Sequence, residues 1–158
     1  MLRLINQHLE EVLITILLVM MSVLIGLQVF MRYVMGDSLT WSEELARYCF
    51  IWCTYLGVSY GVKLHAHISV EAVVHRFSPT IQRWVRLVVY AVFIVFAVLV
   101  VKEGYALSLK IFGFGQTSSS LGIPMGYIYL APTVGFALVI FRLLQNMFYE
   151  VTAKGDSK

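Results

Sequence analysis

The stretch from Val12 to Met31 reads VLITILLVMMSVLIGLQVFM, and none of its twenty residues is charged. A helix rises about 1.5 Å per residue, so this stretch covers about 30 Å, which is the thickness of the hydrocarbon core of a bilayer. A cleaved signal peptide has a shorter apolar core and a small-residue cleavage site, whereas this run is long and follows Glu10 and Glu11. The stretch therefore predicts a membrane-spanning helix that is retained.

The composition of the whole chain supports a membrane protein. Of its 158 residues 59% are hydrophobic and only 13% are charged, with a mean hydropathy of +0.81. Soluble domains carry roughly a quarter of charged residues. The net charge of +3 is small and its basic residues are scattered, which excludes a nucleic-acid footprint. We find no Pro/Ser tract, charge block or internal repeat, so we expect an all-α integral membrane protein with a single domain over residues 1–158.

Three further helices are expected to cross the bilayer. Trp41 and Lys63 extend a shorter apolar run with side chains that favour the membrane interface. Pro79 occupies the first position of the next helix, which is longer than a bilayer core and should protrude at its start. Pro132 predicts a kink in the last helix. The four predicted spans are residues 11–34, 41–63, 79–112 and 124–147.

The basic residues predict the orientation, because cytoplasmic loops carry an excess of Lys and Arg. The N-terminal segment, the second loop and the C-terminal tail hold eight: Arg3, Lys63, Arg76, Arg83, Arg86, Arg142, Lys154 and Lys158. The first and third loops hold four: Arg32, Arg47, Lys102 and Lys110. Both termini are therefore predicted to be cytoplasmic.

A short amphipathic helix is predicted between the second and third spans. Val70, Val73, Val74 and Phe77 recur at the spacing of one helix face, as in helices that lie in the membrane interface. The neighbouring His65, His67 and His75 lack the further ligands of a metal site. We therefore predict no bound metal here.

The segment DSLTWSEELAR, from Asp37 to Arg47, is expected to start the second span. Thr40 and Glu43 have capping-box spacing, and Glu43 and Arg47 have the spacing of an ion pair. A purely structural interpretation explains these residues. The alternative is a docking surface at the outer membrane face, since Glu43, Glu44 and Arg47 are more charges than a cap requires.

Small residues recur every four positions along the second span, at Cys49, Cys53, Gly57 and Gly61. Such a stripe lets a neighbouring helix approach closely, in this chain or in another. Ala131 and Gly135 form a weaker pattern of this kind in the last span.

The sequence lacks the residues that a proton-driven carrier, an enzyme or a haem protein would need. The middles of the first, second and last spans hold no ionisable residue, and only Lys102 and Glu103 approach such depth. No arrangement of nucleophile, base and orienting group is present, and no His lies inside a span to hold a haem. We therefore expect a scaffold and not an enzyme, with no cofactor.

Several stretches resemble one family. WSEELARYCFIW from Trp41 to Trp52, HISVE from His67 to Glu71, LGIPM from Leu121 to Met125 and APTVGFAL from Ala131 to Leu138 are similar to the small membrane subunit of tripartite ATP-independent periplasmic (TRAP) transporters. The resemblance covers roughly residues 10 to 145 and implies four helices with both termini cytoplasmic.

The resemblance also implies a function in the bacterial inner membrane. A periplasmic binding protein captures an organic acid and delivers it to a large membrane subunit, which imports it with a sodium gradient. The resemblance implies that the small subunit braces the large one in a 1:1 complex and holds no substrate or sodium site. The residues that match the family block are Trp41, Glu43, Glu44, Arg47 and Trp52, with His67 as a cytoplasmic counterpart. The sequence of this block is most similar to that of sialic-acid transporters, and transporters of four-carbon dicarboxylates are the alternative.

Two other classes of protein stay open on the residues alone. One is a self-sufficient homodimeric carrier, which needs a buried carboxylate in an early span, whereas Glu10 and Glu11 lie at the edge of theirs. The other is an assembly factor for a different membrane complex.

Overall fold

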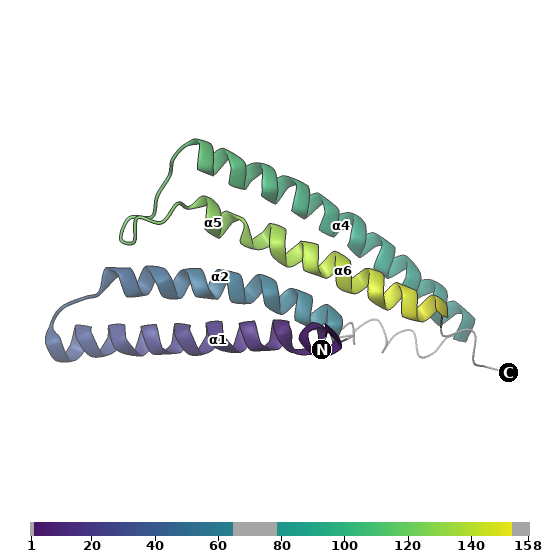
Figure 1. Cartoon of the computed structure of the whole chain (residues 1–158), viewed down its shortest axis with the longest axis horizontal. Helices are drawn as coiled ribbons and strands as arrows, with labels where there is room; N and C mark the ends of the chain where they lie inside the picture. The colour runs from purple at the N-terminus through teal and green to yellow at the C-terminus, as the bar shows by residue number, and fades with distance from the viewer. Residues whose placement is uncertain (1, 65–78, 153–158) are drawn as a thin grey trace.

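The computed structural model describes residues 2–64 and 79–152 of the chain (Figure 1). Helix α1 covers Leu2–Phe30 and continues into a π-helical turn, η1, at Met31–Met35. Helix α2 covers Thr40–Lys63 and α4 covers Pro79–Gly113. A single turn, α5, at Gly126–Tyr129 precedes α6 at Ala131–Thr152. The predicted interfacial helix with Val70, Val73, Val74 and Phe77, and also His67, lie outside the described residues.

The long helices lie side by side in one row and do not form a closed bundle (Figure 1). The order of the row is α1, α2, α6 and α4, and each helix packs extensively on its neighbours in that order. The short α5 packs mainly on α4. Within the described part of the chain no extensive contact joins the two edge helices, α1 and α4. The last helix of the chain therefore lies between two helices that precede it.

Three segments of the described chain are long and apolar enough to cross a bilayer: Glu10–Met35, Trp84–Gly113 and Gly126–Phe148. These correspond to the first, third and fourth predicted spans. Helix α2 begins and ends close to the predicted second span, but its charged residues Glu43, Glu44, Arg47 and Lys63 lower its hydropathy. The prediction of an all-helical membrane protein is confirmed, and the crossing of α2 stays a prediction.

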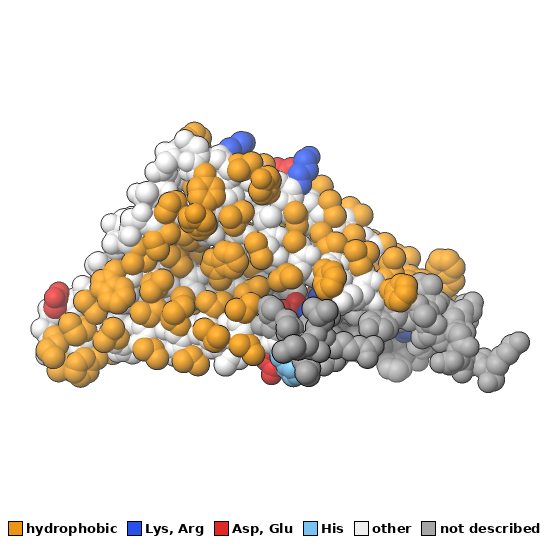
Figure 2. Space-filling view, viewed as in Figure 1, with side chains coloured by type: hydrophobic (Ala, Val, Ile, Leu, Met, Phe, Trp, Pro, Cys, Tyr) orange, Lys and Arg blue, Asp and Glu red, His pale blue; other side chains and the backbone are white. Residues whose placement is uncertain are grey.

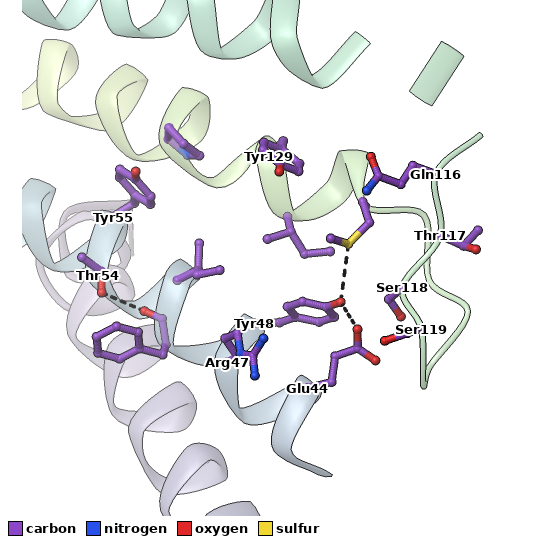
Figure 3. A pocket seen from close by; sticks show the side chains of 15 residues that line it. Glu44, Arg47, Tyr48, Thr54, Tyr55, Gln116, Thr117, Ser118, Ser119 and Tyr129 are labelled. Atoms are coloured by element: carbon purple, nitrogen blue, oxygen red, sulfur yellow. Dashed lines mark hydrogen bonds between the residues drawn. The ribbon is translucent and has the colours of Figure 1, made fainter. Parts of the chain in front are cut away.

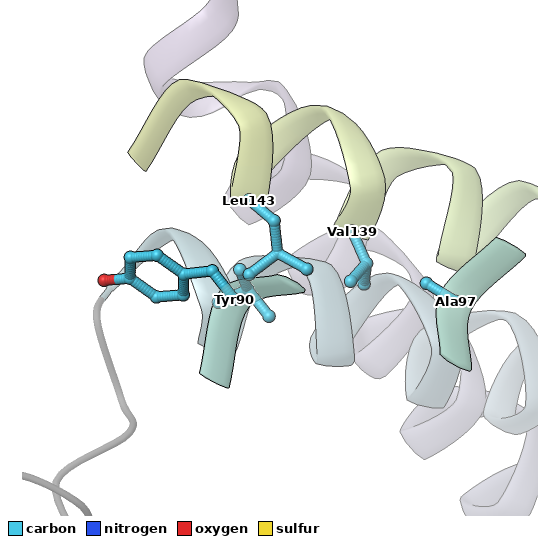
Figure 4. Packing of buried hydrophobic residues seen from close by; sticks show 5 residues of the cluster. Tyr90, Ala97, Val139 and Leu143 are labelled. Atoms are coloured by element: carbon cyan, nitrogen blue, oxygen red, sulfur yellow. The ribbon is translucent and has the colours of Figure 1, made fainter. Parts of the chain in front are cut away.

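The row is held together by two small cores. Val62 of α2, Tyr90 and Ala97 of α4, and Val139 and Leu143 of α6 form the first (Figure 4). Leu24 of α1 packs with Ala46 and Cys49 of α2 in the second. Each core joins adjacent helices of the row, so most of each helix surface stays outside both.

Helices α2 and α6 are in close contact at a glycine. A Cβ atom added to Gly135 would lie 2.7 Å from the backbone oxygen of Tyr55. The weaker small-residue pattern at Ala131 and Gly135 therefore marks a real helix contact. The predicted disturbance at Pro132 is also present, because α5 ends at Tyr129 and α6 begins only at Ala131.

Much of the surface is apolar (Figure 2). Large exposed hydrophobic side chains are spread along α1 and α4, with Val23 63% and Val92 65% exposed. Such extensive apolar surface indicates contact with lipid or with another membrane protein.

Candidate functional site

The start of α2 differs from the predicted capping box. Leu39 is the N-cap residue and makes no side-chain cap hydrogen bond, so Thr40 is already helical. Instead, the Ser42 hydroxyl donates to the Leu39 carbonyl at 2.8 Å. The capping-box prediction is wrong, because the helix begins one residue earlier than its spacing requires.

Glu43 connects the first two helices. Its carboxylate accepts a hydrogen bond from the Gln28 amide of α1 at 3.0 Å and pairs with Arg47 at 3.2 Å. The predicted Glu43–Arg47 pair is confirmed. Their side chains are 56% and 65% exposed, so this pair contributes little to stability and stays available to a partner.

Glu44 points the other way and anchors the loop between α4 and α5 (Figure 3). Its carboxylate accepts the Tyr48 hydroxyl at 2.6 Å, the Ser120 amide at 2.9 Å and the Leu121 amide at 3.1 Å. An isolated antiparallel bridge between Thr117 and Pro124 further orders this loop. Glu44 therefore has a structural role within the chain, and a docking role for it stays a prediction.

A pocket of about 710 Å³ lies between α2 and this loop (Figure 3). Its polar lining includes Arg47 and the loop residues Gln116 and Thr117, while Phe50 and Ile128 belong to its apolar lining. A second, shallower pocket lies between α1 and α2 and shares Arg47 and Phe50. The exposed face of α2 is thus flanked by a hollow on each side.

Six residues form a straight line along this face, and we call them the α2 seam. Their spacing alternates between four and three residues, as in the contact line of a coiled coil. The seam consists of Glu43, Arg47, Phe50, Thr54, Gly57 and Gly61. The first four are exposed, and a Cβ atom added to either glycine would meet nothing within 4 Å in the described chain.

The two halves of the predicted small-residue stripe differ in burial. Cys49 is buried against α1, and Cys53 is partly buried. Among the described residues nothing lies within 4 Å of a Cβ atom added to Gly57 or Gly61, so packing there, in this chain or in another, stays a prediction. Trp41 is 39% exposed and Trp52 is partly buried, so the family block does not form one continuous surface.

A buried ionic cluster that the sequence analysis missed ties α1, α2 and α6 together. Glu10 is 1% exposed, and its Oε1 atom lies 3.1 Å from Arg142 Nε and accepts the Ser59 hydroxyl at 2.9 Å. Lys63 Nζ lies 4.0 Å from the other carboxylate oxygen. The available signal was Arg142, the charge that ends the last apolar stretch, but nothing local assigns it to Glu10.

The described residues contain no group of three or more His, Cys, Asp or Glu side chains that could hold a metal ion. Both cysteines are free thiols.

Comparison with known proteins identifies the family. The family model described as "Tripartite ATP-independent periplasmic transporters, DctQ component" matches residues 21–153. A putative TRAP transporter small permease protein of Haemophilus influenzae is 29% identical over 92% of this chain and 91% of its own length. The sialic acid TRAP transporter small permease protein SiaQ of Vibrio cholerae is 26% identical over 94% of this chain and 84% of its own length.

A longer relative contains the matching region as a small part. The isethionate TRAP transporter permease protein DctMQ of Oleidesulfovibrio alaskensis is 32% identical over 73% of this chain, which corresponds to 18% of that relative. Other small permease proteins that match are named for C4-dicarboxylates. Small subunits of this kind partner with a large permease. The chain is therefore a multi-pass membrane protein of the DctQ family, the small permease subunits of TRAP transporters.

Proposed function

We propose that this chain is the small accessory subunit of a sodium-driven, binding-protein-dependent TRAP transporter in the bacterial inner membrane. As a membrane subunit of a transporter it is not an enzyme. It braces the large transport subunit in an equal ratio. The observation that carries this proposal is the α2 seam, which the described part of the chain leaves uncovered.

We propose that α2 is a fourth span, so that residues 1–158 form one membrane domain with both termini cytoplasmic. Glu10 bonds to Ser59 near one end of the α1–α2 pair, and Gln28 bonds to Glu43 near the other. The eighteen residue-to-residue steps from Glu10 to Gln28 correspond to about 27 Å of helix, close to the thickness of a bilayer core. Because α2 runs antiparallel to α1 over this length, a bilayer crossed by α1 is also crossed by α2.

The seam suits a helix of the large subunit. Gly57 and Gly61 allow close backbone approach, which favours helix association in lipid. Arg47 and Glu43 at the other end of the seam supply charges to the same partner or to the docked periplasmic binding protein. Trp41 precedes them in the first turn of α2. An import mechanism in which one domain moves against a fixed part would use the row as an enlargement of that fixed part.

The substrate is proposed only as a class. The relatives are named for sialic acid, isethionate and C4-dicarboxylates, all of which are organic acids. We propose an organic acid, with sialic acid or a four-carbon dicarboxylate as candidates.

Co-purification tests the accessory role. The tagged chain, extracted in mild detergent with the large permease co-expressed, should recover that permease in equal amount. Gly57→Leu should reduce this recovery, because the new side chain fills the space that a partner helix would occupy. Gly26→Leu is the matched control, since Gly26 on α1 also has nothing within 4 Å of an added Cβ atom. Full recovery of the large permease with Gly57→Leu would show that the α2 seam is not the contact surface.

Uptake tests the docking role of the charged end. Glu43→Lys should lower uptake into reconstituted vesicles without changing substrate affinity of the isolated binding protein. Glu43 is preferred to Glu44 because the Glu44 carboxylate anchors a loop within the chain. Unchanged uptake would contradict the docking role and leave Glu43 only a structural role, through its contacts to Gln28 and Arg47.

The alternative of a self-sufficient homodimeric carrier is addressed by the same purification. Glu10 is a buried carboxylate in an early helix, which is the feature that such a carrier needs. Its pairing with Arg142 at 3.1 Å instead favours a structural role. Recovery of a homodimer that transports substrate by itself would support the carrier and overturn the accessory role.

A further inference from the structure

The exposed face of α4 carries two charges inside a segment that is apolar enough to span the membrane. Lys102 and Glu103 are 77% and 74% exposed at their side chains, and their charged atoms lie 3.8 Å apart. They fall within the candidate span Trp84–Gly113. Charged side chains in membrane segments rarely face lipid and usually mark a functional contact.

The apolar residues on both sides of this pair exclude a simple placement in lipid. On one side Val92, Val95 and Leu99 are 65%, 63% and 54% exposed. On the other side Tyr105 and Leu109 are each 52% exposed. A bilayer placed over both apolar stretches would also cover the charges, because the charges lie between them. A hydrocarbon core placed over the first stretch alone would leave the second one outside the hydrocarbon.

The other described helices do not resolve this conflict. The opposite face of α4 carries Ala97, Gly104 and Ser108, which are used in contacts with α6 and α5. Helix α4 is an edge helix of the row (Figure 1), and the Lys102 and Glu103 side chains, about three-quarters exposed, are not covered by the described neighbours of α4. A partner is therefore needed that offers both apolar surface and polar groups within the membrane.

We infer that the face of α4 around Lys102 and Glu103 is a second contact surface for the large permease, where the two charges meet polar or charged groups of its membrane domain. This inference rests on the proposed accessory function. It assigns the large permease and not lipid, because lipid tails offer no partner for the ammonium or the carboxylate. The α2 seam and the face of α4 would then hold the row at two places.

Photo-cross-linking tests this contact directly. A photoreactive phenylalanine analogue in place of Lys102 should cross-link to the co-expressed large permease in native membranes. The control places the same analogue at Leu13, an exposed residue of α1 at the other edge of the row, where no cross-link to the large permease is expected. Cross-linking at position 102 to lipid alone would overturn the inference.

Charge removal provides an independent measurement. Lys102→Met should lower the recovered complex by about tenfold, because it leaves the partner's groups buried without a counter-charge. Lys110→Met removes the same charge from an exposed position in the last turn of α4 and should leave recovery nearly unchanged. Equal recovery for both variants would overturn the inference. If the unmodified chain recovers no large permease, the proposed function fails; if it does and Lys102→Met matches it, only the α4 contact fails.

Discussion

Removing the charge of Glu10 should destabilise the chain more than any other single change to a polar side chain described above. The side chains of Glu10 and Arg142 are 2% and 8% exposed, so their pair is shielded from water. Glu10→Gln would leave the Arg142 guanidinium buried near the Lys63 ammonium without the carboxylate. Breaking a buried pair in this way costs about 3–5 kcal/mol.

The predicted loss is large enough to measure as a change in melting temperature. For a chain of this length, 1 kcal/mol corresponds to about 2–4 °C. Glu10→Gln should therefore lower the Tm of the purified chain in detergent by about 6–20 °C. Tryptophan fluorescence can follow the transition, because the chain has three Trp residues.

Glu11→Gln is a matched control one residue away. The Glu11 side chain is 53% exposed and lies 3.3 Å from His8, so its Tm should change little. A double change, Glu10→Met with Arg142→Met, should recover much of the loss because it removes both charges of the pair. Equal melting temperatures for the Glu10 and Glu11 variants would refute the assignment of the cluster as a structural tie.

Three other predictions concern contacts within the chain. Glu44→Gln should make the Ser120 and Leu121 amides exchange with solvent several-fold faster, measured by hydrogen exchange, whereas Glu43→Gln should not, since the Glu43 carboxylate bonds to Gln28 and Arg47 instead. Gly135→Ala should cost about 1–3 kcal/mol by forcing α2 and α6 apart, while Gly57→Ala should leave the Tm of the isolated chain unchanged or higher; equal losses would contradict the assigned contacts. Ser108→Ala should cost about 1 kcal/mol because it removes a buried hydrogen bond to the Gly126 carbonyl, against no loss for Ser22→Ala, whose exposed hydroxyl bonds within its own helix.

The long apolar runs made the helices predictable. Helix α4 covers Pro79–Gly113, against a predicted range of 79–112, because length and composition alone define a span. The contacts of polar residues were less predictable. Glu43 bonds to Gln28 of another helix, and Glu10 pairs with Arg142, which lies 132 residues away. Spacing along one helix carries no information on such partners.

The small-residue stripe shows a geometric limit of such spacing. A helix turns about 100° per residue, so residues four apart are offset by about 40°. From Cys49 to Gly61 the stripe therefore turns by about 120°, away from α1 and toward the open face. The alternating spacing of the α2 seam stays on one face, but Glu43 and Arg47 at one end of it are charged, so the seam does not stand out as a stripe of small residues.

The row also has a consequence for synthesis of the chain. Helix α4 emerges before α6, and its extensive contacts among the described helices are with α6 and α5. Until α6 is inserted, the pair α1–α2 and the isolated α4 have no common core, because the first core needs Val139 and Leu143. Helix α6 is thus needed to join the other helices. A nascent chain interrupted after Gly113 would leave the α1–α2 pair and α4 unpacked against each other, accessible to the quality-control proteases of the membrane.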